Sequence, residues 1–278
     1  MIPAAAASFA KPYNRPMKVV LFCGGLGMRL KEYSEIIPKP MINIGYRPIL
    51  WYVMKYYAHF GHKEFILCLG YKADIIKNYF LNYNEYMSND FTMSAGGKDL
   101  ALKSSDIQDW KITFVDTGLH ANIGMRLKAV QKYVENDEYF LANYTDGLSN
   151  CPLPTLIDTL KSSNKTAIFL STRPGFTFHL VSANGDGSVQ DIRDVSRSEV
   201  WVNAGFFVLR PSIFDVIKPG EELVQEPFHR LIQKKELITY KYDGFFVGMD
   251  TFKEKQMLDD MYARGETPWE VWKTPQQS

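Results

Sequence analysis

The sequence has few cysteines and almost no excess of charge of either sign. Only Cys23, Cys68 and Cys151 occur in 278 residues, and none of them belongs to a C-x-x-C pair. This number argues against a disulfide framework and favours a reducing, cytoplasmic location. The 32 basic and 31 acidic residues leave a formal net charge of +1. Such a balance provides no overall field to attract nucleic acid or an acidic membrane surface, so we expect neither as a partner.

Long apolar runs and metal-binding histidine patterns are also lacking. No stretch approaches the ~18 apolar residues that a membrane span needs, and the five histidines show no metal-ligand spacing. By contrast, 46% of the residues are hydrophobic, which is enough apolar material for a folded core. A length of 278 residues suits one large domain or two small ones.

The two ends of the sequence differ in character from the rest. Residues 1–16 (MIPAAAASFAKPYNRP) lack the basic start and the apolar centre of a signal peptide. We interpret them as a disordered extension, with Met17 as the functional start, and residues 274–278 as a short tail. Trp269 and Trp272 predict that the segment just before this tail packs back onto the domain or onto a neighbouring subunit.

Strand-like and helix-like segments alternate along the first part of the chain. The apolar runs that predict buried strands are 18–23, 65–69, 112–115, 138–144 and 167–171. The segments with helical spacing are 48–60, 73–83, 124–134 and 153–161. This alternation predicts a three-layer α/β fold with a Rossmann-like, mostly parallel sheet. Shorter segments after about residue 175 predict a small mixed or antiparallel portion in the second half, and the polar stretch 84–110 predicts a flap or an oligomer contact.

A glycine-rich turn follows the first predicted strand, at residues 24–30 (GGLGMRL). Glycine lets the backbone approach a ligand closely, and the exposed N–H groups of such a turn can cradle phosphates. The P-loop pattern is not matched, and Leu30 takes the place of the third glycine of the dinucleotide fingerprint. The cations that remain are Arg29 in the turn and Lys39 in the segment 38–41 (PKPM). Together they suit a triphosphate, which Arg binds through two parallel bonds and Lys as a point charge.

These motifs resemble the sugar-phosphate nucleotidyltransferases, and most closely their glucose-1-phosphate cytidylyltransferase branch. The segments that carry the resemblance are GGLGMRL at 24–30, PKPM at 38–41, IGYRPILWYVMKYY at 44–57, GYKADIIKNYF at 70–80, FVDTG at 114–118, RLKAV at 126–130, YTDG at 144–147, NAGFFVL at 203–209, QEP at 225–227 and FFVGMDT at 245–251. VDTG, QEP and PWEVW at 268–272 favour the cytidylyl branch. The resemblance covers residues 17–273 as a single domain, with a nucleotide-binding part at 17–172 and an acceptor-binding part at 173–273.

The resemblance implies a magnesium-dependent transfer of a cytidylyl group from CTP to a sugar 1-phosphate, which gives a CDP-sugar and pyrophosphate. It assigns Arg29, Lys39 and Asp146 to catalysis, and Asp146 and Asp250 to the metal ion. The positions that it assigns to nucleotide binding are Leu21, Cys23, Gly24, Gly25, Gly27, Met28, Arg29, Lys39, Thr117, Gly118, Arg126 and Tyr144. The positions that it assigns to acceptor binding are Gly147, His179, Arg193, Asn203 and Gly205. Members of the family are often oligomeric, so a homo-oligomer is expected.

The sequence departs from the family pattern at two positions that bear on the substrates. Met28 stands where the family has a threonine, and Val195 stands where it has the lysine that binds the acceptor phosphate. A valine supplies neither charge nor a hydrogen-bond donor. Arg173, Arg193 or Arg197 could substitute as the cation.

Three hypotheses therefore stay open. The protein uses a sugar 1-phosphate with a relocated cation, or it cytidylylates a different phosphorylated acceptor that need not be a sugar, or it is a non-catalytic nucleotide-binding protein. Retention of Arg29, Lys39, Asp146 and Asp250 favours catalysis, because binding alone needs no pair of metal-holding carboxylates. The sequence indicates neither the acceptor nor the pathway.

Overall fold

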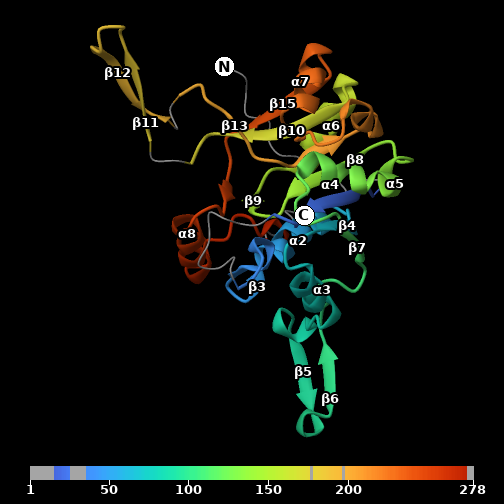
Figure 1. Ribbon diagram of the computed structural model, residues 1–278. Coiled ribbons are helices and arrows are strands. Elements are labelled where there is room, and N and C mark those ends of the chain that lie inside the picture. Colours follow the sequence, from blue (N-terminus) through green and yellow to red (C-terminus); the bar gives the residue numbers. More distant parts are fainter. Residues whose placement is uncertain (1–15, 26–35, 176–177, 196–197, 274–278) are drawn as a thin grey trace.

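The structure is a computed structural model that describes residues 16–25, 36–175, 178–195 and 198–273 (Figure 1). Its strands are β1 (Lys18–Phe22), β2 (Asn43–Ile44), β3 (Arg47–Pro48), β4 (Glu64–Leu69), β5 (Phe91–Ser94), β6 (Asp99–Leu102), β7 (Lys111–Asp116), β8 (Phe140–Tyr144), β9 (Gly147–Ser149), β10 (Ala167–Thr172), β11 (His179–Ala183), β12 (Val189–Asp194), β13 (Val202–Asn203), β14 (Phe207–Leu209), β15 (Leu237–Tyr242) and β16 (Phe246–Gly248). Its α-helices are α2 (Ile49–His59), α3 (Ala73–Leu81), α4 (Ile123–Ala129), α5 (Gln131–Val134), α6 (Leu153–Ser163), α7 (Glu226–Gln233) and α8 (Phe252–Ala263).

The main sheet runs in the order β7-β4-β1-β8-β14-β10, and β15 and β13 also pair with β10. The neighbours β7, β4, β1 and β8 are all parallel, as are β10 and β15. Strand β14 is antiparallel to both β8 and β10. The predicted fold class is confirmed, because the sheet is mostly parallel and its antiparallel strands come from the second half of the chain.

Helices cover both faces of this sheet. Val19 and Leu21 of β1 belong to an apolar core that includes α2 and α6, whereas Val20 and Phe22 belong to a second core with α4, α5 and α7. Alternate residues of a strand point to opposite faces, so a strand buried on both sides reads as a continuous apolar run. The run at 18–23 has this character, and the three-layer arrangement that it predicts is confirmed.

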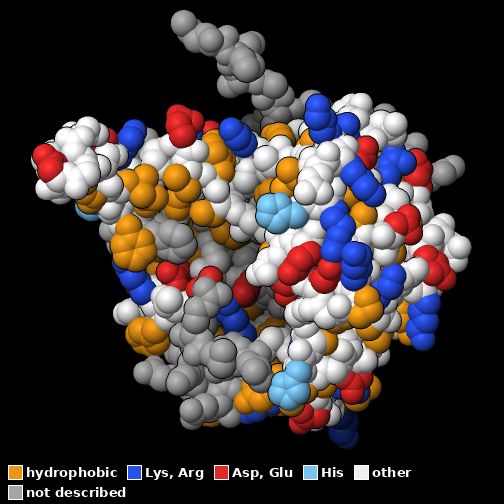
Figure 2. Space-filling model, turned by 45° about the horizontal axis from the view of Figure 1, so that its top comes forward, with side chains coloured by type: hydrophobic (Ala, Val, Ile, Leu, Met, Phe, Trp, Pro, Cys, Tyr) orange, Lys and Arg blue, Asp and Glu red, His pale blue; other side chains and the backbone are white. Residues whose placement is uncertain are grey.

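One expected helix is divided, and two hairpins project from the body. The predicted helix at 124–134 divides at Val130, whose φ of −102° and ψ of 6° end α4 before α5 begins. The segment 84–110 contains the β5–β6 hairpin, which projects from the body in Figure 1. A second hairpin, β11–β12, projects from another part of the molecule, and hydrophobic side chains gather along it at the upper left of Figure 2.

The segment before the C-terminal tail packs back onto the domain, as its tryptophans predict. Trp269 is 1% exposed and its ring lies near those of Tyr52 and Phe245. Trp272 packs against Trp51 and Tyr52 of α2. Within the described ranges, the helices are too short or too polar to cross a membrane.

A buried histidine makes the stability of this fold depend on pH. His62 is fully buried, and its Nδ1 accepts a hydrogen bond of 2.9 Å from the backbone N–H of Met17. Burial lowers the pKa of His62 from 6.5 to about 4. Between these two values the unfolded chain binds a proton that the folded chain does not. The stabilisation from the neutral imidazole is therefore complete above pH 6.5 and declines as the pH falls towards 4.

We expect the free energy of unfolding to fall by about 1.4 kcal/mol per pH unit in this window on account of His62. Urea denaturation at a series of pH values measures the slope. His62→Asn keeps a hydrogen-bond acceptor near Nδ1 but does not titrate, so its slope should be shallower by that amount. Equal slopes for the two proteins would contradict this assignment.

Candidate active site

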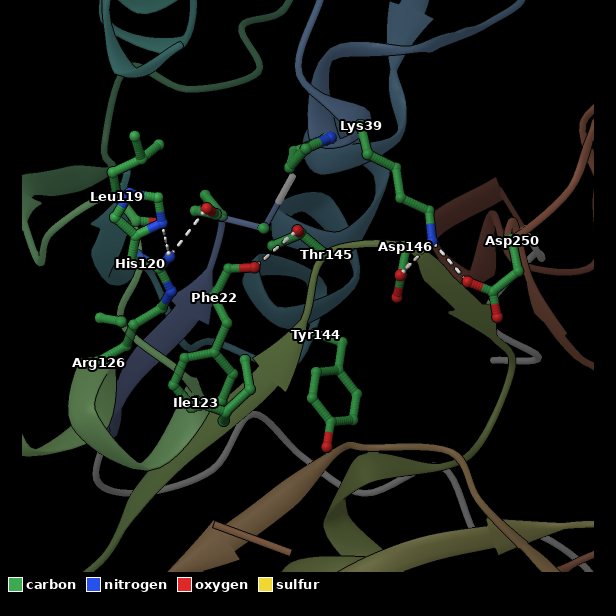
Figure 3. Close-up of a pocket in the computed structure, with 15 residues that line it drawn as sticks. Phe22, Lys39, Leu119, His120, Ile123, Arg126, Tyr144, Thr145, Asp146 and Asp250 are labelled. Carbon is green, nitrogen blue, oxygen red and sulfur yellow. Dashed lines mark hydrogen bonds and ion pairs between the residues drawn. The ribbon is translucent and has the colours of Figure 1, made fainter. Parts of the chain in front are cut away.

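A cavity of about 480 Å³ opens at the carboxyl ends of the parallel strands β1 and β8. This is the edge of an open α/β sheet at which ligands bind. The residues that line it are Phe22, Cys23, Gly24, Gly25, Lys39, Pro40, Leu119, His120, Ala121, Ile123, Arg126, Tyr144, Thr145, Asp146 and Asp250. Figure 3 shows that they come from both sides of the strand ends.

Three charged side chains meet on one side of this cavity. The Nζ of Lys39 donates to Asp146 Oδ2 at 2.5 Å and to Asp250 Oδ1 at 2.7 Å (Figure 3). The lysine side chain is 12% exposed, and the two carboxylates are about one-third exposed. The triad therefore contains two negative charges that share one positive charge in a partly buried place.

The pairing of two short strands brings these carboxylates together. Asp146 follows β8 and directly precedes β9, whereas Asp250 comes two residues after β16. Strands β9 and β16 are antiparallel, with Gly147 opposite Gly248, and the N–H of Met249 donates to the carbonyl of Asp146 at 2.8 Å. The two carboxylates that the resemblance assigns to the metal ion thus lie beside one another at the strand ends.

The donor set fits a magnesium ion. Among the described residues no group of three or more His, Cys, Asp or Glu side chains forms a metal site. Magnesium, however, needs only one or two carboxylates when phosphate oxygens and waters complete its coordination. The ammonium group of Lys39 already bridges Asp146 and Asp250, so an oxygen of each carboxylate faces one point that a cation can occupy. Asp146 and Asp250 are therefore the residues that would hold the ion.

Arg126 organises the opposite side of the cavity. It lies in α4 and is 2% exposed. Its Nη1 donates to the carbonyl of Leu69 at 3.1 Å, to Thr117 Oγ1 at 2.7 Å and to the carbonyl of Gly118 at 3.0 Å. Its Nη2 donates to the carbonyl of Gly24 at 2.9 Å. One guanidinium thus ties together the ends of β1, β4 and β7.

Gly24 is required by this packing. A Cβ atom at position 24 would lie 2.1 Å from Nη1 of Arg126, which is far inside van der Waals contact. The glycine therefore lets the backbone at the end of β1 approach the guanidinium.

At the base of the cavity a hydrogen bond joins two strand ends, and the cysteine thiol there is unreactive. Thr145 Oγ1 donates to the carbonyl of Phe22 at 3.0 Å, which joins the ends of β8 and β1. Cys23 is fully buried, and this burial raises the pKa of its thiol well above the usual value. A neutral thiol is a poor nucleophile, so Cys23 serves as part of the wall. Burial likewise raises the pKa of Tyr144.

The structure brings half of the predicted nucleotide-binding residues and both predicted metal-binding residues to this cavity. Those on its wall are Cys23, Gly24, Gly25, Lys39, Arg126, Tyr144, Asp146 and Asp250. Thr117 and Gly118 do not line the cavity but accept hydrogen bonds from Arg126, which does. Leu21 lies in β1 within the core. Gly27, Met28, Arg29 and Arg197 lie outside the described residues.

Sequence reasoning missed the wall made by residues 119–121 and Ile123. Leu119, His120 and Ala121 lie between β7 and α4, directly after the FVDTG motif. The position of this segment between a strand end and a helix start was the available signal, because such connections border the ligand site of α/β sheets. Phe22, Pro40 and Thr145 are neighbours of residues that the motifs did identify.

Two chain comparisons identify the family. The protein is 38% identical to the glucose-1-phosphate cytidylyltransferase of Salmonella typhimurium over 258 residues, which are 92% of this chain and 100% of that protein. It is 36% identical, with the same coverage, to a protein of Bacillus subtilis named probable glucose-1-phosphate cytidylyltransferase. The chain belongs to the glucose-1-phosphate cytidylyltransferase family.

A solved structure agrees with this family at the level of the fold. UDP-glucose pyrophosphorylase complexed with UDP-glucose has a TM-score of 0.66 and 15% identity, over 90% of this chain and 100% of that one. No protein-family model matches the chain.

The acceptor-side residues of this cytidylyltransferase family member fall into two groups. Gly147 begins β9 beside Asp146, and Asn203 and Gly205 lie at the break between β13 and β14. Gly205 has a φ of +78°, and its N–H donates to Asn203 Oδ1 at 2.9 Å. A Cβ atom at Gly205 would lie 2.4 Å from Asn143 Oδ1, so this turn requires glycine.

The other group lies on the β11–β12 hairpin. His179 and Arg193 are exposed there, and Arg193 pairs with Asp191 at 3.1 Å. Neither residue lines the cavity. Val195, at the end of the hairpin, is 7% exposed and donates its N–H to the carbonyl of Phe178.

Arg173, another candidate for the relocated cation, also lies outside the cavity lining. It follows β10 and stacks over the Trp201 ring at 4.1 Å. Its Nη1 donates to the carbonyl of Ser198 at 2.5 Å and its Nε to Asp243 Oδ1 at 3.3 Å. The guanidinium is thus held at the carboxyl edge of the sheet by two partners and one aromatic face.

Proposed function

We propose that this protein transfers the cytidylyl group of CTP to a sugar 1-phosphate, with glucose 1-phosphate as the first candidate, and releases pyrophosphate. The observation that carries the proposal is the Lys39–Asp146–Asp250 triad in a cavity at the carboxyl edge of the sheet. Two carboxylates and a lysine suit a reaction in which negative charge accumulates on phosphate oxygens. The name of the Salmonella relative supplies the nucleotide and the acceptor.

In the proposed reaction an oxygen of the acceptor phosphate attacks the α-phosphorus of CTP. The bond between the α-phosphorus and the bridging oxygen breaks, and its electron pair leaves with pyrophosphate. Such a reaction needs positioning and charge stabilisation more than covalent chemistry from the protein. A magnesium ion supplies charge neutralisation on the phosphate oxygens when it is bound.

Each side chain of the triad has a role in this proposal. Asp146 and Asp250 hold the ion, and Lys39 offsets the charge that develops on the leaving pyrophosphate. Arg126 and Gly24 shape the end of β1, where the nucleotide would lie. A homo-oligomer is part of the proposal, with the projecting β5–β6 hairpin as a candidate contact.

The test is pyrophosphate release with CTP and Mg²⁺ against a panel of phosphorylated acceptors. The panel contains glucose 1-phosphate, other sugar phosphates, phosphorylated polyols and phosphorylated amino acids, and the other nucleoside triphosphates serve as controls. Release with CTP and a sugar 1-phosphate is the expected result. If no acceptor in the panel gives pyrophosphate release while CTP still binds, the result would contradict the proposal and favour a nucleotide-binding role.

For the identity of the acceptor, one observation favours a second candidate, a phosphorylated molecule that is not a sugar. Val195 is buried and uncharged, so it cannot pair with an acceptor phosphate as the family lysine does. Release only with a non-sugar acceptor would mean that this part of the site has a different specificity. Release with glucose 1-phosphate would mean that another cation takes the role of the lysine, with Arg173, Arg193 and Arg197 as the candidates.

A further inference from the structure

The Lys39 ammonium group occupies the place between the carboxylates that hold the metal ion in the proposed function. It bonds one oxygen of Asp146 at 2.5 Å and one oxygen of Asp250 at 2.7 Å. Magnesium binds carboxylate oxygens at about 2.1 Å, so an ion that shared these two oxygens would lie beside the ammonium group. The two cations would repel strongly at such a separation in a partly buried site. Lys39 and a divalent ion held by this pair of carboxylates therefore compete with one another.

The main chain at Lys39 is fixed, whereas its side chain is long enough to turn away. Lys39 begins a short 3-10 helix (Lys39–Met41), and the next two residues, Pro40 and Met41, are buried. The N–H of Met41 donates to the carbonyl of Pro38 at 2.8 Å, and the N–H of Ile42 donates to the carbonyl of Lys39 at 3.1 Å. Four carbons link this anchored backbone to an ammonium group with three rotatable donors. The charge can move within the cavity by rotation of side-chain bonds alone.

We propose that Lys39 closes the metal site in the nucleotide-free protein and opens it when a triphosphate takes the ammonium group. The inference rests on the proposed function, because that function identifies the ligand as a nucleoside triphosphate. In the free protein Lys39 pairs with both Asp146 and Asp250. When phosphate oxygens enter the cavity, Lys39 pairs with them and withdraws from both carboxylates. The phosphates and the divalent ion thus bind together, so the cavity takes up the nucleotide–metal complex rather than the metal ion alone.

Two consequences follow for binding. The free protein has a low affinity for divalent ions, because they must displace an internal counter-ion. CTP raises that affinity, and by thermodynamic reciprocity the ion raises the affinity for CTP by the same factor. A preformed metal site would lack this coupling through Lys39.

The test is a Mn²⁺ titration of the protein without nucleotide. The concentration of free Mn²⁺ is measured by electron paramagnetic resonance. Lys39→Met removes the ammonium group and keeps a side chain of similar length. We expect Lys39→Met to bind Mn²⁺ at least about tenfold more tightly than the unmodified protein, because one competing charge is gone. Lys63→Met is the matched control, since Lys63 pairs with Asp109 in an exposed position away from the cavity. Its Mn²⁺ affinity should equal that of the unmodified protein.

A double variant locates the gained affinity. Adding Asp146→Asn to Lys39→Met should abolish the gain, because one of the two carboxylates is then neutral. Thermal melting gives an independent readout. Mn²⁺ should raise the melting temperature of Lys39→Met more than that of the unmodified protein, because it binds the folded variant more tightly.

Equal Mn²⁺ affinities for Lys39→Met and the unmodified protein would overturn the inference, as would a gain that survives Asp146→Asn. These outcomes are independent of turnover. A protein that makes a CDP-sugar but shows no gain refutes the competition by Lys39 and leaves the proposed function standing. A protein that shows the gain but is silent in the pyrophosphate assay supports the competition and refutes the proposed function.

Discussion

Asp146→Asn is expected to lower kcat/KM for pyrophosphate release by about three orders of magnitude while the protein remains folded. The change removes one of the two negative charges that would hold the divalent ion, and it removes one partner of Lys39. Asp250→Asn should have a loss of similar size, because its carboxylate occupies the equivalent place on the other side of Lys39. Steady-state kinetics at saturating Mg²⁺ measures both losses.

The matched control for these variants is Asp158→Asn, an exposed aspartate in α6. It makes the same chemical change away from the cavity and should leave the kinetics within about twofold of the unmodified protein. Circular dichroism and thermal melting should give similar curves for all of these proteins. Near-normal activity in both Asp146→Asn and Asp250→Asn would show that the two carboxylates do not belong to the catalytic site.

Arg126→Met is expected to lower the free energy of unfolding by about 3 kcal/mol and to weaken CTP binding at least about tenfold. The guanidinium donates to the carbonyls of Gly24, Leu69 and Gly118 and to the hydroxyl of Thr117. Methionine has a similar length but no donor, so these four acceptors lose the guanidinium, and the hydrogen bonds lost to the carbonyls of Gly24 and Leu69 are buried. The end of β1 then loses the group that holds it in place for the nucleotide.

Urea denaturation and calorimetric titration with CTP measure the two effects separately. Arg126→Lys keeps the charge but lacks the planar fork, so it should restore only part of the stability. Arg264→Met, at an exposed arginine that pairs with Glu266, should match the unmodified protein in both measurements. If Arg126→Met weakens CTP binding with no loss of stability, the arginine acts by direct contact with the nucleotide rather than by holding the strand ends.

The parallel part of the fold is predictable because its signal is local. Residues 19–22 are apolar at successive positions, and each of these side chains of β1 finds a core on its own face of the sheet. The break between β13 and β14 is different. It depends on Phe206, whose φ is +48° and whose N–H donates to Asn143 Oδ1 on another strand. No pattern within residues 200–209 indicates that partner.

The site likewise has features that the sequence predicts and features that it does not. The glycines, Lys39 and the two carboxylates stand in recognisable motifs, and the structure brings Lys39, Asp146 and Asp250 together. The sequence does not reveal that Lys39 spans both carboxylates, because this contact joins three distant segments. The role of Arg126 is hidden for the same reason, since its acceptors follow three different strands. The assignments of individual residues to nucleotide, acceptor and metal stay predictions until the variants are measured.

The β9–β16 pair has a consequence for how the protein matures. These two short strands are far apart in the sequence, and their pairing holds the segment with Asp146 beside the segment with Asp250. Pairings between distant segments form late in folding, because the intervening chain must first be closed into a loop. A chain in which this pairing has not yet formed therefore lacks the arrangement that sets Asp250 beside Asp146. If the two carboxylates hold the metal ion as proposed, catalytic competence arises only once this pairing has formed.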